Sequence, residues 1–197
     1  MHGATFWQRD SAEALSRTVI DIMLFDRLEA NQADAARNLQ IRGERPISAK
    51  NVTKTMVISG KADYVLGYNH PTDSGKPGFE SCSVVVEAKK RNTFHEGLAQ
   101  TVAYMVGVQQ DRRKLRRIVD TVYGMLADGT SWQFLRLDGK RLLISESYDS
   151  LVERNLPLVN RFIDSVIRAA VSSSPHTTPN PRFPSTKIAW LRRPNYG

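Results

Sequence analysis

The chain has 197 residues, 41% of them hydrophobic, which fits one globular domain with a core of its own. Its 28 lysine and arginine residues exceed its 20 acidic residues, and the net charge of +8 favours a polyanionic partner such as nucleic acid. The chain has no apolar run long enough to span a membrane, no apolar secretory signal, and a single cysteine, Cys82, which excludes an internal disulfide. We therefore expect an intracellular protein, cytoplasmic or nuclear, without a membrane partner.

The first predicted element is a long amphipathic helix over residues 10–39. The apolar residues that recur at helical spacing are Leu15, Val19, Ile22 and Met23. Asp10 can cap this helix, with Glu13 three residues later in an arrangement close to a capping box. A structural role for Glu13 at the helix start is therefore available from the sequence alone.

Two strands are predicted next, near residues 56–59 and 62–68, after a connector that contains the glycine and proline of residues 42–46. Residues 69–78 are dense in turn formers and predict a mobile loop close to the substrate. His70 in this loop is a candidate contact residue, and a solvent-exposed histidine is the alternative.

A buried strand then ends in the triplet Glu87-Ala88-Lys89. Residues i and i+2 of a strand point to the same face, so Glu87 and Lys89 should stand together. If Asp63 lies opposite them on a neighbouring strand, the two carboxylates can hold Mg²⁺, and Lys89 can position or activate the attacking water. The alternative is an ordinary strand end with solvated charges.

A capping box at Thr93 and Glu96 predicts a helix that runs to about residue 110. Gln100 and Tyr104 are four residues apart and therefore share one face of this helix, where they can face a substrate or the lysine. In the alternative interpretation Tyr104 belongs to the core and Gln100 lies at its rim.

The order of Gly60-x-x-Asp63, Glu87-Ala88-Lys89 and Gln100-x-x-x-Tyr104 resembles the PD-(D/E)XK nuclease superfamily. The similarity is greatest to its RecB-like branch and to the N-terminal nuclease domain of type I restriction enzyme motor subunits, and it covers residues 10–170. One position departs, because Ala62 stands where a proline often precedes the aspartate. The resemblance implies an α/β fold with a restriction-endonuclease-like core, a central mixed β-sheet flanked by helices.

The resemblance also implies roles for individual residues. Gln100 and Tyr104 would support the catalytic group, in which Lys89 is the catalytic lysine, and Mg²⁺ would be the cofactor, with Mn²⁺ as a substitute. The implied metal ligands are Asp63, Glu87, Ala88 and Glu13, with Asp21 and Asp26 as rivals of Glu13 for the place on the first helix.

Residues 121–148 read as three strands joined by turns at Asp128-Gly129 and Asp138-Gly139. The residues expected as buried anchors are Trp132, Phe134 and Leu142. A last helix is predicted over residues 151–170, which completes the domain at residues 1–170. Residues 171–197 are rich in proline and serine and predict an extended tail, a candidate binding segment for a protein partner.

Basic residues cluster at three places, one of them Arg192-Arg193 in the tail, and the other two are candidate nucleic-acid contacts. The first cluster, Lys90 and Arg91, adjoins the proposed site. The second, Arg112, Arg113 and Arg116, follows the Gln100 helix, where a solvated connector is the alternative. The sequence therefore predicts a metal-dependent nuclease that hydrolyses phosphodiester bonds, with DNA as the expected substrate. The alternative is an inactive nuclease-like module that binds nucleic acid or a protein.

Overall fold

The computed structural model describes residues 12–31, 39–50, 55, 57–70, 78–87 and 94–173. The helices and strands along the chain are α1 (Ala12–Ala30), β1 (Leu39–Lys50), β2 (Val57–His70), β3 (Gly78–Glu87), α2 (Phe94–Lys114), β4 (Val122–Ala127), β5 (Ser131–Asp138), β6 (Arg141–Asp149) and α3 (Leu156–Ser172). The structure gives only the backbone for residues 12–14, 70, 82–87 and 94–96.

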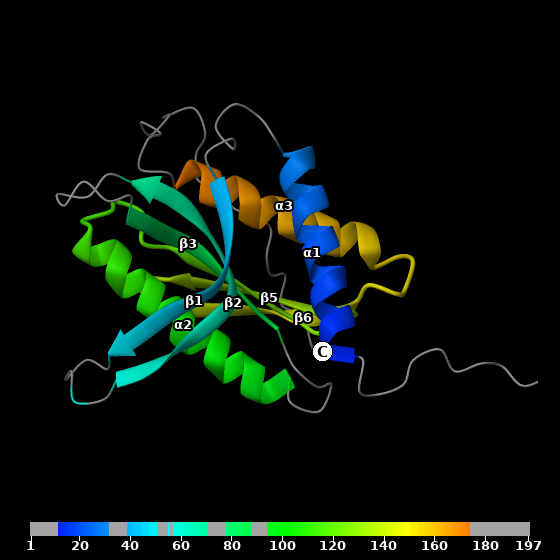
Figure 1. The fold of residues 1–197 in the computed structure, drawn as a ribbon, viewed down its shortest axis with the longest axis horizontal. Helices are drawn as coiled ribbons and strands as arrows, with labels where there is room; N and C mark the ends of the chain where they lie inside the picture. Colours follow the sequence, from blue (N-terminus) through cyan, green and yellow to red (C-terminus); the bar gives the residue numbers. More distant parts are fainter. Residues whose placement is uncertain are drawn as a thin grey trace, which may run out of the picture.

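All six strands form one sheet in the order β1-β2-β3-β4-β5-β6. Neighbours pair antiparallel except β3 and β4, which are parallel and joined by α2. Helix α2 covers one face of the sheet, and α1 and α3 cross each other on the other (Figure 1). The predicted class, a central mixed sheet flanked by helices, is confirmed.

Each face of the sheet carries its own hydrophobic cluster. Under α1 and α3, Ile20 and Ile163 pack with Trp132 and Phe134 of β5. Under α2, a second cluster includes Leu135, the residue that follows Phe134 on the opposite face. Strand β4 is buried along its whole length, because helices cover both faces of the sheet at this strand.

The N-terminal half departs from the sequence prediction in two ways. The first helix ends at Ala30 rather than near residue 39, and residues 42–46 lie inside β1 rather than in a connector. Glycine and proline suggested a loop, but among the described strands β1 pairs only with β2 and lies at the edge of the sheet, where both residues are tolerated. Glu44 in this strand has a φ of 47°, which marks a local irregularity.

Other boundaries also shift. The two strands predicted at residues 56–59 and 62–68 are one strand, β2. Helix α2 continues to Lys114, four residues beyond the predicted end, and α3 begins at Leu156 rather than near residue 151, with Pro157 in its first turn.

The three strands and two turns of the C-terminal half agree with the prediction, whereas α3 continues to Ser172, two residues into the predicted tail. Three strands occupy residues 122–149, and both predicted turns carry a glycine at positive φ, 85° at Gly129 and 59° at Gly139. Trp132 and Phe134 are fully buried, whereas Leu142 is partly buried. Outside the described residues lie the predicted helix cap at Asp10, Thr93 and the Glu96 side chain of the predicted capping box, residues 71–77 of the predicted loop and residues 174–197 of the predicted tail. The side chains of His70 and Cys82 also lie outside them.

Within the described part of the chain, none of the helices combines the length and apolar character that a membrane crossing needs.

Candidate active site

Asp63 lies on β2 at a point where the alternation of side chains is interrupted. Ala62 and Val65 both belong to the cluster under α2, although they are three residues apart and a regular strand puts only residues an even number apart on one face. The interruption lies opposite Glu44, the β1 residue with positive φ, between the pairs Arg45↔Ala62 and Gly43↔Tyr64. Such irregularities re-aim a side chain, and here Asp63 reaches toward α1.

The carboxylate of Asp63 forms an ion pair with Arg17 of α1. Arg17 Nη2 donates to Asp63 Oδ1 at 3.2 Å, with 37% of the arginine side chain and 17% of the aspartate side chain exposed. The pair is therefore open to solvent on the arginine side. Sequence analysis did not single out Arg17, although it lies three residues before the buried Ile20 and so on the inward side of the helix.

Helix α1 is fixed above this point by the turn between β4 and β5. Ser16 Oγ donates to the carbonyl oxygen of Asp128 at 2.8 Å. A Cβ at Gly129 would lie 2.8 Å from Ser16 Cα, so glycine permits the close approach as well as the φ of 85°. Two consecutive residues of α1, Ser16 and Arg17, thus contact the end of β4 and the middle of β2.

Glu87 ends β3, the strand between those two. Its backbone pairs with Ala127 of β4, the residue just before Asp128, and Val85 pairs with Tyr64, the residue just after Asp63. The structure therefore brings the backbone positions of Asp63 and Glu87 close together, in the part of the sheet that Ser16 and Arg17 of α1 contact. The side chain of Glu87 lies outside the described residues, as do Ala88, Lys89, Lys90 and Arg91 in full.

The three acidic candidates on α1 differ in position. Glu13 and Asp21 each lie one helical turn from Arg17, before and after it, and only the backbone of Glu13 is described. Asp26 lies nine residues from Arg17, about 13 Å along the helix axis, and pairs with Arg27 at 2.7 Å in an exposed position. Asp26 is therefore remote from Asp63, and Glu13 and Asp21 remain candidates.

Gln100 and Tyr104 contact each other, and Tyr104 also lies against Gly60, the first residue of the Gly60-x-x-Asp63 motif. Gln100 is exposed and its Nε2 donates to Tyr104 Oη at 2.8 Å, while Tyr104 is only 4% exposed. A Cβ at Gly60 would overlap this hydroxyl and lie 2.9 Å from Tyr104 Cζ, so α2 packs directly on β2 at Gly60. This is the geometry of a core tyrosine with a glutamine at its rim, and the supporting role of the pair in catalysis stays a prediction.

The donor chemistry of the predicted set suits a hard cation, because carboxylate oxygens are the ligands that Mg²⁺ prefers. Of the implied set Asp63, Glu87, Ala88 and Glu13, Asp63 alone has its side chain among the described residues, and Arg17 contacts one of its oxygens. No group of three or more metal-ligating side chains occurs among the side chains that the structure describes. The metal set stays a prediction that rests on Asp63 and on the backbone position of Glu87.

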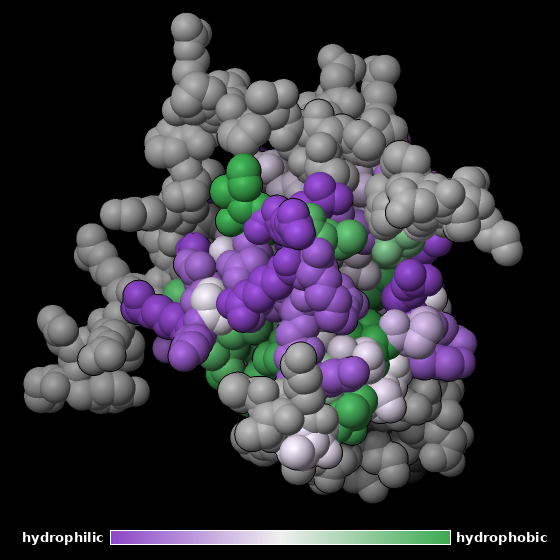
Figure 2. All heavy atoms as spheres, turned by 90° about the vertical axis from the view of Figure 1, so that its left-hand side faces the viewer, coloured by the Kyte–Doolittle hydropathy of each residue, from purple (hydrophilic) through white to green (hydrophobic). Residues whose placement is uncertain are grey.

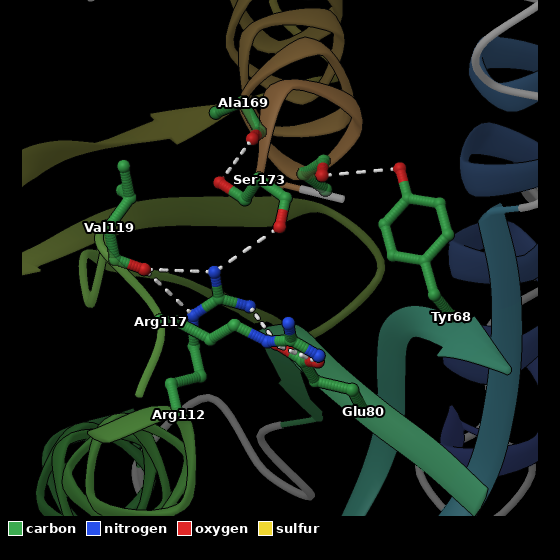
Figure 3. Close-up of polar contacts among 8 residues, drawn as sticks. Tyr68, Glu80, Arg112, Arg117, Val119, Ala169 and Ser173 are labelled. Atoms are coloured by element: carbon green, nitrogen blue, oxygen red, sulfur yellow. Dashed lines mark hydrogen bonds and ion pairs between the residues drawn. The ribbon is translucent and has the colours of Figure 1, made fainter. Parts of the chain in front are cut away.

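The prediction that Arg112 contacts nucleic acid is wrong. Its side chain is 1% exposed, and its Nη1 donates to Glu80 Oε1 at 2.8 Å (Figure 3). The same guanidinium donates to the carbonyl oxygens of Val119 at 2.9 Å and Ser173 at 3.3 Å. A guanidinium enclosed by these acceptors is not available to a phosphate, so Arg112 joins α2, β3 and the end of α3 instead.

Glu80, which sequence analysis missed, is the centre of this buried group. Its side chain is 2% exposed, and besides Arg112 it accepts from Arg117 Nε at 2.9 Å (Figure 3). Beside the group, Tyr68 Oη donates to the carbonyl oxygen of Ala170, which also ties β2 to α3. A glutamate within a strand, directly after the aromatic Phe79, was the available signal, since an ionised carboxylate is buried only with partners.

Arg113 and Arg116, the other residues of the predicted cluster, are exposed. Arg113 pairs with Asp120 at 2.6 Å. The described residues on the side of the molecule where α2 ends are mostly hydrophilic (Figure 2). This surface is distant from the candidate site, since Arg113 follows Gln100 by thirteen residues of helix, about 20 Å.

Comparisons with known proteins give this chain no family. No family model matches it, and no curated protein matches it. The functional argument therefore rests on the residues and on the arrangement of the strands that hold them.

Proposed function

We propose that this chain is a metal-dependent nuclease that hydrolyses phosphodiester bonds of DNA. The observation that carries the proposal is the bridge formed by Ser16 and Arg17 of α1, which contact the end of β4 and Asp63 of β2. Glu87 ends β3, the strand between β2 and β4. The backbone positions of Asp63 and Glu87, the two acidic residues of the predicted triad, are therefore close together in the sheet.

The order of the elements supports a restriction-endonuclease-like core. Strands β1, β2 and β3 form an antiparallel meander, α2 crosses over one face, and β4 returns parallel to β3 while α1 lies on the opposite face. In such a core the acidic residues and the lysine would come from β2 and β3, the strands that hold Asp63 and precede Lys89.

In this proposal Asp63 and Glu87 hold Mg²⁺ or Mn²⁺, with Ala88 and a first-helix carboxylate, Glu13, as further ligands. The ion supplies a bound water of lowered pKa and offsets the negative charge of the scissile phosphate. Lys89 assists the attacking water. Gln100 holds the Tyr104 hydroxyl against β2 at Gly60, three residues before Asp63, and so fixes the strand that carries the carboxylate.

The test uses the second acidic-x-Lys triplet of the chain as a matched control. Lys89→Ala should abolish cleavage of linear and circular DNA in Mg²⁺ or Mn²⁺ while the variant stays folded and still binds DNA. Lys140→Ala, in the exposed turn between β5 and β6, should leave cleavage unchanged. Near-normal cleavage by Lys89→Ala would remove the catalytic assignment.

One observation favours the second candidate, an inactive nuclease-like module that binds nucleic acid. The carboxylate of Asp63 already has a cationic partner in Arg17, and a domain that had lost its metal would satisfy this carboxylate in the same way. This candidate predicts DNA binding with no cleavage and with no rise in melting temperature on addition of Mn²⁺. A rise of several degrees together with cleavage would exclude it.

A further inference from the structure

The ion pair between Arg17 and Asp63 joins a surface-accessible cation to the predicted metal ligand on β2. We propose that Arg17 is a counter-ion switch. It holds Asp63 while no metal is bound, and when a divalent cation takes the carboxylate it turns to bind a phosphate of the nucleic acid. This inference rests on the proposed function and adds to it a residue that controls metal entry and substrate binding.

The geometry of the pair suits an exchange of partners. Arg17 Nη2 and Asp63 Oδ1 lie 3.2 Å apart, longer than the 2.7–2.9 Å typical of a charge-assisted hydrogen bond. With 37% of the arginine side chain exposed, solvent screens the attraction. Exposed pairs shift an equilibrium by up to about five-fold, and this partly exposed pair is close to that class, so a divalent cation can compete for the carboxylate.

The helix that carries Arg17 is anchored, so only the side chain has to move. Ser16 is bonded to Asp128, and Ile20, one turn after Arg17, is fully buried in the core. Between these two fixed points the guanidinium is attached through a flexible chain of methylene groups. Once released from Asp63, it remains within a side-chain length of the metal site.

The chemistry of the released group points to a phosphate. A guanidinium presents a planar fork of donors that matches two phosphate oxygens, and it carries its charge at neutral pH. Metal and Arg17 repel each other, so a cation bound at Asp63 weakens the hold of Arg17 on the same carboxylate. Binding of the cation at Asp63 and binding of a phosphate at Arg17 should therefore favour each other.

The experiment compares Arg17→Met with Arg27→Met. Arg27 lies on the same helix and also forms an ion pair, but with Asp26 and Asp164. Mn²⁺ binding is measured by calorimetry and by the rise in melting temperature. DNA binding in Mn²⁺ is measured by fluorescence anisotropy with a short labelled duplex, in a Lys89→Ala background so that the duplex stays intact.

Arg17→Met should bind Mn²⁺ about two- to five-fold more tightly than the wild type, because the competing cation is gone. In saturating Mn²⁺ it should bind DNA about ten-fold more weakly, because a phosphate contact is lost. Arg27→Met should match the wild type in both. If Arg17→Met fails to fold, Arg17→Lys keeps the charge and should lose part of the DNA affinity because it lacks the fork.

Two results would overturn the switch in different ways. Cleavage by the wild type together with equal Mn²⁺ and DNA affinities in the Arg17 and Arg27 variants would overturn the switch and leave the nuclease assignment standing. Absence of both cleavage and Mn²⁺ binding in the wild type would overturn the nuclease assignment and the switch with it.

Discussion

Two carboxylates, one near each end of β3, differ in their exposure to solvent and in their ion-pair partners. Glu80, near the start of the strand, is enclosed by Arg112 and Arg117 with 2% of its side chain exposed. Asp63, on the neighbouring strand near the other end, has 17% of its side chain exposed and pairs with an arginine that reaches solvent. A carboxylate held by two guanidinium groups away from water serves the fold, whereas one at the surface can exchange its partner. In this chain burial, rather than charge, separates the scaffold from the candidate site.

Removing the charge of Glu80 should have the largest effect. Glu80→Gln leaves the guanidinium of Arg112 buried without a counter-charge, which should cost about 3–5 kcal/mol of unfolding free energy. Urea denaturation followed by circular dichroism measures this loss. Arg113→Gln is the control, because Arg113 follows Arg112 in the same helix. This substitution breaks the exposed pair with Asp120 and should cost less than about 1 kcal/mol. Equal losses of unfolding free energy in the two variants would contradict the idea that burial of the ion pair decides its contribution to stability.

The contact between Gly60 and Tyr104 gives the next effect. Gly60→Ala places a methyl group against the tyrosine hydroxyl and should cost about 1–3 kcal/mol. Tyr104→Phe removes the hydroxyl, so the double variant should be more stable than the sum of the two single changes predicts. Strict additivity in this double-mutant cycle would mean that α2 does not press on β2 at this point.

A stabilising change is expected where α2 ends. Arg116 has a φ of 54°, and the bonds from its N–H to Arg113 and from the N–H of Arg117 to Arg112 form a Schellman motif. Arg116→Gly relieves the left-handed strain and should raise the unfolding free energy by about 0.5–1 kcal/mol. Lys114→Gly, in the last turn of the same helix, should lower it by about 1 kcal/mol. A loss of stability in both variants would count against the motif.

The smallest stability effect is predicted for the candidate site itself. Without metal, Asp63→Asn should change the unfolding free energy by less than about 1 kcal/mol, because the pair with Arg17 is partly exposed. The same substitution should remove most of the Mn²⁺-dependent rise in melting temperature. Calorimetric scans with and without Mn²⁺ separate the two effects, and an unchanged rise would exclude Asp63 as a ligand.

The sequence predicted best where local chemistry decides the structure. The turns at Gly129 and Gly139 need a residue at positive φ, and the neighbouring aspartates and flanking apolar runs were sufficient to place both. The burial of Trp132 and Phe134 followed from the same alternation along β5.

The predictions from the sequence failed where a residue's interaction partner is far away in the chain. Arg112 lies in a run of basic residues that looked solvated, but its partner Glu80 is 32 residues earlier on another element. On the first helix, the predicted apolar positions included Ile22, which is 63% exposed, whereas Ile20 and Leu24 are buried. Sequence spacing gave the helix but not which side faces the sheet, and Arg17 was overlooked for this reason.

The parallel pairing of β3 with β4 has a consequence for the order of folding. Strands β1 to β3 and β4 to β6 are two meanders, each made of antiparallel neighbours joined by short connections. The pairing of β3 with β4 forms only after the chain has passed through α2, from residue 88 to residue 121, so its pairs carry the largest loop-closure entropy in the sheet. The two meanders should therefore form early and join late. Because Asp63 and Glu87 belong to the first meander and the turn that anchors α1 belongs to the second, the candidate site is assembled only in that last step.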